Sequence, residues 1–320
     1  MLLVIVDNGV TWTKMAAVGT WHHCDLLATR VDPGNIQRTI PHGQPGLPRL
    51  LSLRRGSDCL PRPVGHRSDP LKIVFSRKGF DSKSGGGPSP IIDGTLFSLP
   101  IPADKYPSAS TYGALGLGDA VTKVSKTLTA ESLCHEDPMF WDNKCAFGQT
   151  GTAQSHLDNN DVGVGDVFLF FGLFTGCGSK DRHHRIFGYL NVEKVLLIGS
   201  QPKGDEVAGT LRQHPHTIEK WETDERWDKN NTIYTGSGRK TTKPLEILLL
   251  TKPGGKTSYW AVPPWLRETE LTYHKRRSRW LEDGFLRVVA RGQEFITDIG
   301  DRPEANKWLN EVITAIETDE

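Results

Sequence analysis

Two apolar stretches decide the fold, Val164-Gly-Asp-Val-Phe-Leu-Phe-Phe171 and Arg185-Ile-Phe-Gly-Tyr-Leu-Asn-Val192. Each is rich in β-branched, aliphatic and aromatic residues, and glycine or polar residues bound each. A Gly-Asp turn opens the first, and the second returns with a Gly-aromatic-aliphatic pattern. They predict two adjacent strands of a small barrel, in which most of the apolar side chains form the core.

Further short runs of the same type predict a strand-rich domain. These strands are expected at 73–76, 96–101, 245–250, 259–262 and 285–290. Helices are expected at 120–134, at 150–159 and after Asp301, which we predict to be the N-cap because Glu304 follows three residues later. The expected fold class is therefore α+β, with a single β-rich domain from residue 72 to residue 320.

The first 71 residues differ in composition from the rest. They contain no Glu, Phe or Tyr but seven prolines, and they show no period of 2 or 3.6 beyond the first six residues. Such a stretch buries too little apolar area to offset its chain entropy. A disordered tail and a small accessory domain are both compatible with this. We favour a third hypothesis, in which the stretch is translated from a misplaced start and Leu71 marks the codon that initiates.

Composition narrows the class of protein. The chain has 320 residues, 37% of them hydrophobic, and a net charge of +1, so attraction to phosphate has to come from local patches. No apolar run reaches the roughly 18 residues of a spanning helix, and the N-terminus lacks the cationic start of a signal peptide. Five widely spaced cysteines indicate reduced thiols, and we expect a cytoplasmic protein.

A glycine-rich loop, Phe80-Asp-Ser-Lys-Ser-Gly-Gly-Gly-Pro-Ser-Pro90, follows the first strand of the domain. Exposed backbone amides in such a loop can approach an anion, and Asp81 and Ser82 are candidate nucleotide contacts. On physical grounds alone, a flexible turn before a hairpin is the preferred explanation of the loop. Neither this loop nor Gly236–Thr242 matches a P-loop.

Cys134-His-Glu-Asp137 raises the question of a metal. No C-x-x-C pair is present, and the other potential ligands have no spacing that demands an ion; they are Cys145, Cys177, His183, His184, His214 and His216. The sequence therefore predicts no metal site. Acid–base or nucleotide-contact roles for His135 and Asp137 remain, beside the alternative of a plain polar turn.

Two further segments carry residue types that suit nucleic acid. Phe147–Leu157 places Gln149, Gln154 and His156 near a helix start, where amides could read base edges or could satisfy buried backbone groups. His274-Lys-Arg-Arg-Ser-Arg-Trp280 is the densest cationic run, and it could contact phosphate or be a solvated loop.

The two strands quoted first resemble the PUA and EVE group of nucleic-acid-binding barrels. A longer series of motifs resembles the nucleotide modification associated domain 3 family from Lys72 almost to the end. The motifs are Phe80-Asp-Ser, Gly87-Pro-Ser-Pro-Ile91, Ser98-Leu-Pro-Ile-Pro102, Cys134-His-x-Asp-Pro138, Phe147-Gly-Gln-x-Gly-x-Ala-Gln-x-His-Leu157, Gly165-Asp-x-Phe-Leu-Phe-Phe-Gly172, His214-Pro-His216, Asn231-x-x-Tyr234 and Arg291-Gly-Gln-Glu-Phe295. Glu136 departs from it, because the resemblance leads us to expect an aliphatic residue there.

The resemblance implies a bacterial or phage setting and an association with systems that modify DNA bases, but it supplies no reaction. We therefore expect a protein that acts on nucleotides or DNA bases, with His135, Asp137 and His156 as acid–base groups. The expected nucleotide-binding residues are Asp81, Ser82, Gln149, Gln154, His214, His216, Lys275, Arg276, Arg277, Arg279, Arg291, Gln293 and Glu294.

The alternative is a non-catalytic reader that recognises a modified base in a barrel cleft. Whether the protein is an enzyme stays open at this stage, because no conventional cofactor motif is present and no cofactor can be named. Expected partners are DNA or a nucleotide, together with other modification or restriction proteins, and no membrane.

Overall fold

The computed structural model divides the 320-residue chain into two compact units, Met1–Pro63 and Val64–Glu320, which we treat separately. The structure describes residues 2–7, 10–15, 71–103, 108–199, 207, 209–218, 229–252, 254–281, 284–290 and 294–318.

In the first unit, β1 (Leu2–Asp7) and β2 (Val10–Met15) form an antiparallel two-stranded sheet. The second of these strands lies beyond the six residues in which the sequence showed any period. Residues 16–70 lie outside the described part of the chain, so the hypothesis of a disordered or mis-assigned extension stays a prediction.

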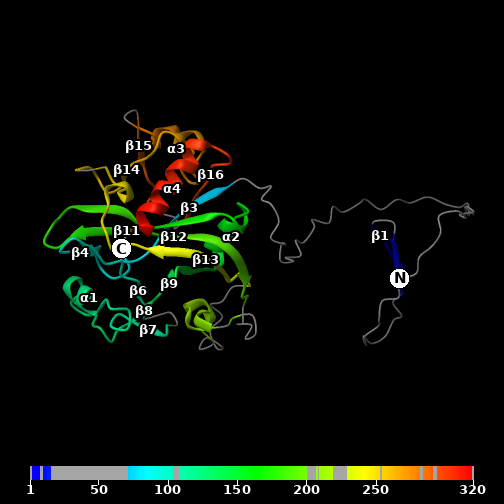
Figure 1. Ribbon diagram of the computed structural model, residues 1–320, viewed down its shortest axis with the longest axis horizontal. Coiled ribbons are helices and arrows are strands. Elements are labelled where there is room, and N and C mark those ends of the chain that lie inside the picture. The colour runs from blue at the N-terminus through cyan, green and yellow to red at the C-terminus, as the bar shows by residue number, and fades with distance from the viewer. Residues whose placement is uncertain are drawn as a thin grey trace, which may run out of the picture. The chain divides into compact units, whose positions relative to one another are not determined.

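A large sheet dominates the second unit (Figure 1). Its main path runs through β16 (Glu294–Asp298), β3 (Lys72–Arg77), β11 (Val167–Gly176), β12 (Arg182–Leu197), β13 (Thr232–Lys240), β10 (Lys144–Gln149) and β9 (Met139–Trp141). Beside it, β4 (Ser89–Ile92) pairs with the far end of β11 and with β5 (Thr95–Leu96). β3 and β4 run parallel to β11, and the other pairs are antiparallel.

Strand β11 is buried on both faces, and this explains its near-continuous apolar sequence. Leu169 and Phe171 belong to one core cluster, which also contains Trp260 and the apolar stripe of the last helix. Phe168 and Phe170 belong to a second cluster, on the opposite face, because successive side chains of a strand alternate. The predicted pairing of the two quoted stretches is confirmed by the β11–β12 ladder.

The remaining elements cover the sheet or form small satellites. α4 (Pro303–Glu317) buries Ala305, Leu309, Val312 and Ile316. The others are β6 (Ile101–Pro102), β7 (Ser110–Thr111), α1 (Gly118–Val124), β8 (Leu133–His135), α2 (Gly151–Asp158), the 3-10 turns η1 (Gly209–Gln213), η2 (Pro215–Thr217), η4 (Glu246–Leu248) and η5 (Arg277–Arg279), β14 (Tyr259–Ala261), α3 (Trp265–Glu268) and β15 (Phe285–Arg287). Within the described residues, no helix is long and apolar enough to cross a membrane.

Three expected elements were wrong in extent. The helix expected at 120–134 stops at Val124, because the Ser125 hydroxyl accepts the amides of Thr127 and Leu128, and Leu133–His135 then pairs as strand β8. The strand expected at 245–250 is mostly the turn η4, and an isolated bridge pairs Leu249 with Arg185 of β12. The strand expected at 96–101 is divided between β5 and β6.

The last helix begins later than predicted, with Arg302 rather than Asp301 as the N-cap. Pro303 occupies the first turn, where its fixed φ suits a helix start, and the residue before a proline disfavours helical angles. The helices expected at 150–159 and near the C-terminus are otherwise confirmed.

The large sheet curls without closing. Gln149 at the end of β10 donates a hydrogen bond to Glu294 at the start of β16, although these strands are far apart in the strand order. In the described residues no backbone ladder joins the two ends of this order. A mixed α+β, strand-rich unit is therefore observed, whereas a closed PUA-like or EVE-like barrel is not.

Candidate active site

A buried carboxylate, Asp137, lies at the centre of the candidate site. It follows β8 in a short turn and precedes Pro138 across a cis peptide bond. Its Oδ1 accepts the amide of Gly148 on β10 at 3.0 Å, and only 5% of its side chain is exposed. The carboxylate is therefore held between two strands that are distinct in sequence.

Two histidines reach Asp137 from η2. His214 Nε2 lies 3.3 Å from Asp137 Oδ1, and His216 Nε2 lies 3.8 Å from Oδ2. Pro215 starts this tight turn, and the His214 ring caps it by accepting the amide of His216 at Nδ1. Because the turn is locked in this way, both rings of the His-Pro-His motif are directed to one carboxylate.

Hydrogen bonds assign the tautomers of these rings. The buried Asn231 donates from Nδ2 to the His216 carbonyl, so its Oδ1 is the atom that lies 2.7 Å from His216 Nδ1. His216 Nδ1 therefore carries the proton, and Nε2 is the unprotonated nitrogen. In His214 the order is reversed, because Nδ1 accepts an amide and Nε2 is left to carry the proton toward Asp137.

His135 completes the group from the end of β8. Its Nε2 lies 3.9 Å from Asp137 Oδ2, and its ring centroid is 5.7 Å from that of His216. One potential ligand atom from each of His135, Asp137 and His216 lies within 4.8 Å of the others. The sequence placed these three residues in one polar site but predicted no metal there, because His216 is about eighty residues from His135 and approaches it only through the fold.

The charge states of the group follow from its burial. Burial lowers the pKa of His135 to about 3 and the pKa of His216 to about 4, although the Asp137 carboxylate opposes both shifts. Burial would raise the pKa of Asp137, but the hydrogen bond from His214 and the charges of His214, Lys78 and His216 hold that pKa below its usual range. At neutral pH the site therefore combines a carboxylate with neutral imidazoles at His135 and His216.

A second polar group, around Glu294, is linked to the first by Lys78. Glu294 Oε1 accepts from Gln149 Nε2 at 2.9 Å and from Ser76 Oγ at 3.3 Å, and it lies 3.5 Å from Lys78 Nζ. Burial raises the pKa of Glu294 in spite of these partners. Lys78 also lies over the Phe147 ring, at 4.0 Å from its centroid, and its charge acts on Asp137.

His156 lies beside this second group, on α2. Its ring packs against Tyr273 at 4.7 Å between centroids, and burial lowers its pKa while a backbone hydrogen bond at Glu294 raises it. Tyr273 is 51% exposed and directly precedes the cationic segment 274–279. The structure thus places His156 with Glu294, and it gives no contact between His156 and the Asp137 group among the described residues.

The cationic segment 274–279 contains one buried structural residue and several exposed cations. His274 is buried and structural, because it donates from Nδ1 to the Thr272 carbonyl and accepts the Val289 amide at Nε2. Lys275, Arg276 and Arg277 are exposed, and Arg279 is half-buried and donates to the Arg287 carbonyl. The exposed cations therefore follow closely in sequence after Tyr273, the residue that packs on His156.

Several other expected site residues make hydrogen bonds within the protein, and their expected nucleotide contacts stay predictions. Asp81 accepts the amides of Lys83 and Ser84 in its own loop, and Ser82 is exposed. The Gln154 amide donates to Asp158 and to Tyr234, and the Gln149 carbonyl accepts the Thr150 amide. Both glutamine side chains are thus bonded within the protein. Arg291 and Gln293 lie outside the described residues.

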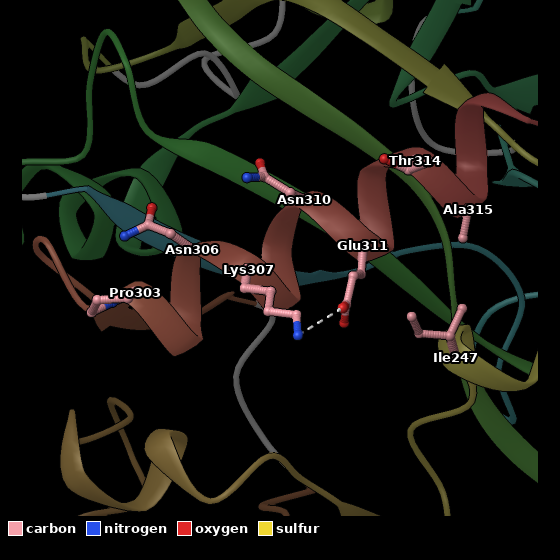
Figure 2. Close-up of a pocket in the computed structure, with 8 residues that line it drawn as sticks. All are labelled: Ile247, Pro303, Asn306, Lys307, Asn310, Glu311, Thr314 and Ala315. Atoms are coloured by element: carbon pink, nitrogen blue, oxygen red, sulfur yellow. Dashed lines mark ion pairs between the residues drawn. The ribbon is translucent and has the colours of Figure 1, made fainter.

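A shallow hollow of about 670 Å³ lies elsewhere, along the outer face of α4 (Figure 2). Residues of this helix line it together with Ile247, and an ion pair joins Lys307 to Glu311 at 3.9 Å. It shares no residue with the Asp137 or Glu294 groups and offers no comparable cluster.

Sequence reasoning also missed Lys78, Ser76 and Asn231 as parts of the site. Asn231 was visible as part of a motif, but its role depends on a ring fifteen residues earlier. Nothing in the sequence around Lys78 indicates a site residue, because it simply follows the apolar strand β3.

Fold and site together define a strand-rich α+β protein with a buried imidazole–carboxylate centre beside a lysine–glutamate pair. The family model described as nucleotide modification associated domain 3 matches residues 72–298. The chain therefore belongs to the nucleotide modification associated domain 3 family. No curated protein and no solved structure matches the chain.

Proposed function

We propose that this protein modifies a base of DNA or of a nucleotide, and that the Asp137 group is its reaction centre. The observation that carries the proposal is the convergence of three imidazoles on one buried carboxylate. Neutral imidazoles beside a carboxylate suit general acid–base work at neutral pH. Membership of a nucleotide modification associated family supports a base as the target.

Substrate binding is assigned to the adjacent surface. The exposed Tyr273 ring can stack on a base, and the cations that follow it can hold phosphate. Glu294 acts electrostatically on Tyr273 and pairs with Lys78, whose charge acts on Asp137, and in this proposal the pair positions the target. His156, which packs under Tyr273, acts in this proposal as a positioning residue rather than as the acid–base group expected from sequence.

Mass spectrometry of nucleosides tests the proposal. DNA from cells that express the wild-type chain should contain a nucleoside that is absent from cells without the gene. The His135→Gln variant should abolish this product, and the matched His183→Gln variant should retain it, because His183 pairs with Asp181 away from the site. An unchanged nucleoside profile with the wild-type chain would overturn the modifying role.

A reader of modified nucleic acid is the second candidate, and the Tyr273–Arg277 surface favours it independently of any chemistry. A reader should bind modified DNA saturably without changing the nucleoside profile. The cleft of a PUA-like barrel was the expected binding place, whereas the binding place proposed here is the exposed surface that begins at Tyr273. A cytoplasmic location, a bacterial or phage setting and partners among modification or restriction proteins belong to both proposals.

A further inference from the structure

We propose that His135, Asp137 and His216 bind one divalent first-row transition-metal ion, which the sequence did not predict. The inference concerns the reaction centre of the proposed function. Metal binding is measured directly, so it can fail or succeed separately from base modification.

The two oxygens of Asp137 have different surroundings, and this division supports the site. Oδ1 faces the Gly148 amide and His214 Nε2, which are both proton donors. Oδ2 faces His135 Nε2 and His216 Nε2 at 3.9 and 3.8 Å. One oxygen is therefore held by the protein, while the other points between two imidazoles.

These separations are too long for hydrogen bonds but close to those of ligands that share an ion. With metal–ligand bonds of about 2.1 Å in tetrahedral geometry, two ligand atoms lie about 3.4 Å apart. The observed 3.8 and 3.9 Å require each nitrogen–carboxylate pair to close by about half an ångström. The nitrogens of His135 and His216 lie within 4.8 Å of each other, and they have to close by up to about 1.4 Å. Rotation of the side chains is sufficient for a change of this size.

The residues that contact the three ligands orient them as such a site needs. Asn231 fixes the His216 ring with the proton on Nδ1, so that Nε2 presents its lone pair toward Asp137. His214 Nε2 lies 3.3 Å from Asp137 Oδ1, on the side of the carboxylate away from the proposed ion, while His214 Nδ1 accepts the His216 amide. His214 is accordingly an outer partner and not a fourth ligand.

The donor set selects the class of ion. Two imidazole nitrogens with one carboxylate oxygen suit Fe²⁺, Zn²⁺ or Mn²⁺, whereas Mg²⁺ and Ca²⁺ prefer sites built from oxygen alone. Three protein ligands also leave coordination positions for water or substrate. The charge of the neighbouring Lys78 acts on all three ligands.

Metal titration of the purified, chelator-treated full chain tests the inference, with Fe²⁺ under anaerobic conditions, Zn²⁺, Mn²⁺ and Mg²⁺ as separate probes. We expect one equivalent of Fe²⁺ or Zn²⁺ to bind, and Mg²⁺ to bind far more weakly. His135→Gln and His216→Gln should each weaken binding by at least about 100-fold, and His183→Gln should not. Circular dichroism checks that each variant is folded.

Asn231→Ala should weaken binding by about 10- to 100-fold, because the His216 ring loses its fixed tautomer. Asn231→Asp keeps an acceptor for His216 Nδ1 and should recover part of that loss. The absorption of bound Co²⁺ reports directly on imidazole ligation. A wild-type chain that binds none of the transition ions, or ligand variants that bind as tightly as wild type, would overturn the inference.

Discussion

At the residue scale, Gly148 shows how one small side chain allows the site to form. A Cβ at this position would overlap the His216 ring and would lie 2.9 Å from Cε1 of His214. Gly148 also donates the amide that holds Asp137 Oδ1. The absence of a side chain thus lets the η2 histidines approach strand β10.

We therefore expect Gly148→Ala to lower the free energy of unfolding by about 1–3 kcal/mol and to displace the imidazoles. Denaturant titration measures the first effect, and the nucleoside and metal assays measure the second. Gly163→Ala is the matched control, because a Cβ there meets no atom within 4 Å. Equal stability and activity of the two variants would contradict this account of Gly148.

The membership of the site could be predicted from the sequence, whereas the role of each residue could not. His135, Asp137, His214, His216, Gln149 and Glu294 were all expected in the site, and the structure brings them together in two linked groups. Their roles could not be read from the chain. Gln149 was expected to read a base edge but is bonded to Glu294, because both residues are buried where the sheet curls.

At the element scale, the segment from Leu271 to Val289 depends on His274. This buried ring joins the Thr272 carbonyl to the Val289 amide, and Trp280 donates to the His274 carbonyl. Burial lowers the pKa of His274 to about 4, and the charges of Arg279 and Arg77 act in the same direction. The ring is therefore neutral in the folded protein at pH 7.

A pH dependence of stability follows from this shift. The unfolded chain binds a proton at His274 below its ordinary pKa of 6.5, and the folded chain does so only near pH 4. The contribution to stability is thus complete above pH 6.5 and is lost as the pH falls from 6.5 to 4. It amounts to about 3 kcal/mol.

Unfolding measurements on His274→Gln test this expectation, because glutamine keeps an acceptor for Val289 but does not titrate. The stability difference between wild type and His274→Gln should shrink by about 3 kcal/mol between pH 7 and pH 4. Lys275→Gln, at the exposed neighbour, should show a difference that does not vary with pH. A constant difference for His274→Gln would contradict the assignment.

At the scale of the whole molecule, we propose that the second unit carries all of the function. Every described residue of the site lies after Leu71, and the family match begins at Lys72. Leu71 packs on the core, and its carbonyl accepts the Ile299 amide. A shortened chain should therefore keep position 71.

A chain that begins at position 71, with Met in place of Leu71, should match the full chain in metal binding and nucleoside product. A chain that begins at Val74 is the control, because it removes the first residues of β3 and should be less stable. A folded but inactive chain from position 71 would contradict the proposal. Mass spectrometry of the native protein tests the misplaced start, and one abundant peptide from residues 10–60 would rule that start out.

The sequence by itself determined the strand-rich class, the β11–β12 pairing, the last helix and the family, because these depend on local periodicity and on short motifs. Only the tertiary structure decided that Gln149 at the end of β10 meets Glu294 at the start of β16, and that His135, Asp137 and His216 lie close together. The physical reason is that a strand's sequence records which side chains are buried but not how far the sheet curls. The curl sets which strand ends meet, and the side chains at those ends form the candidate site.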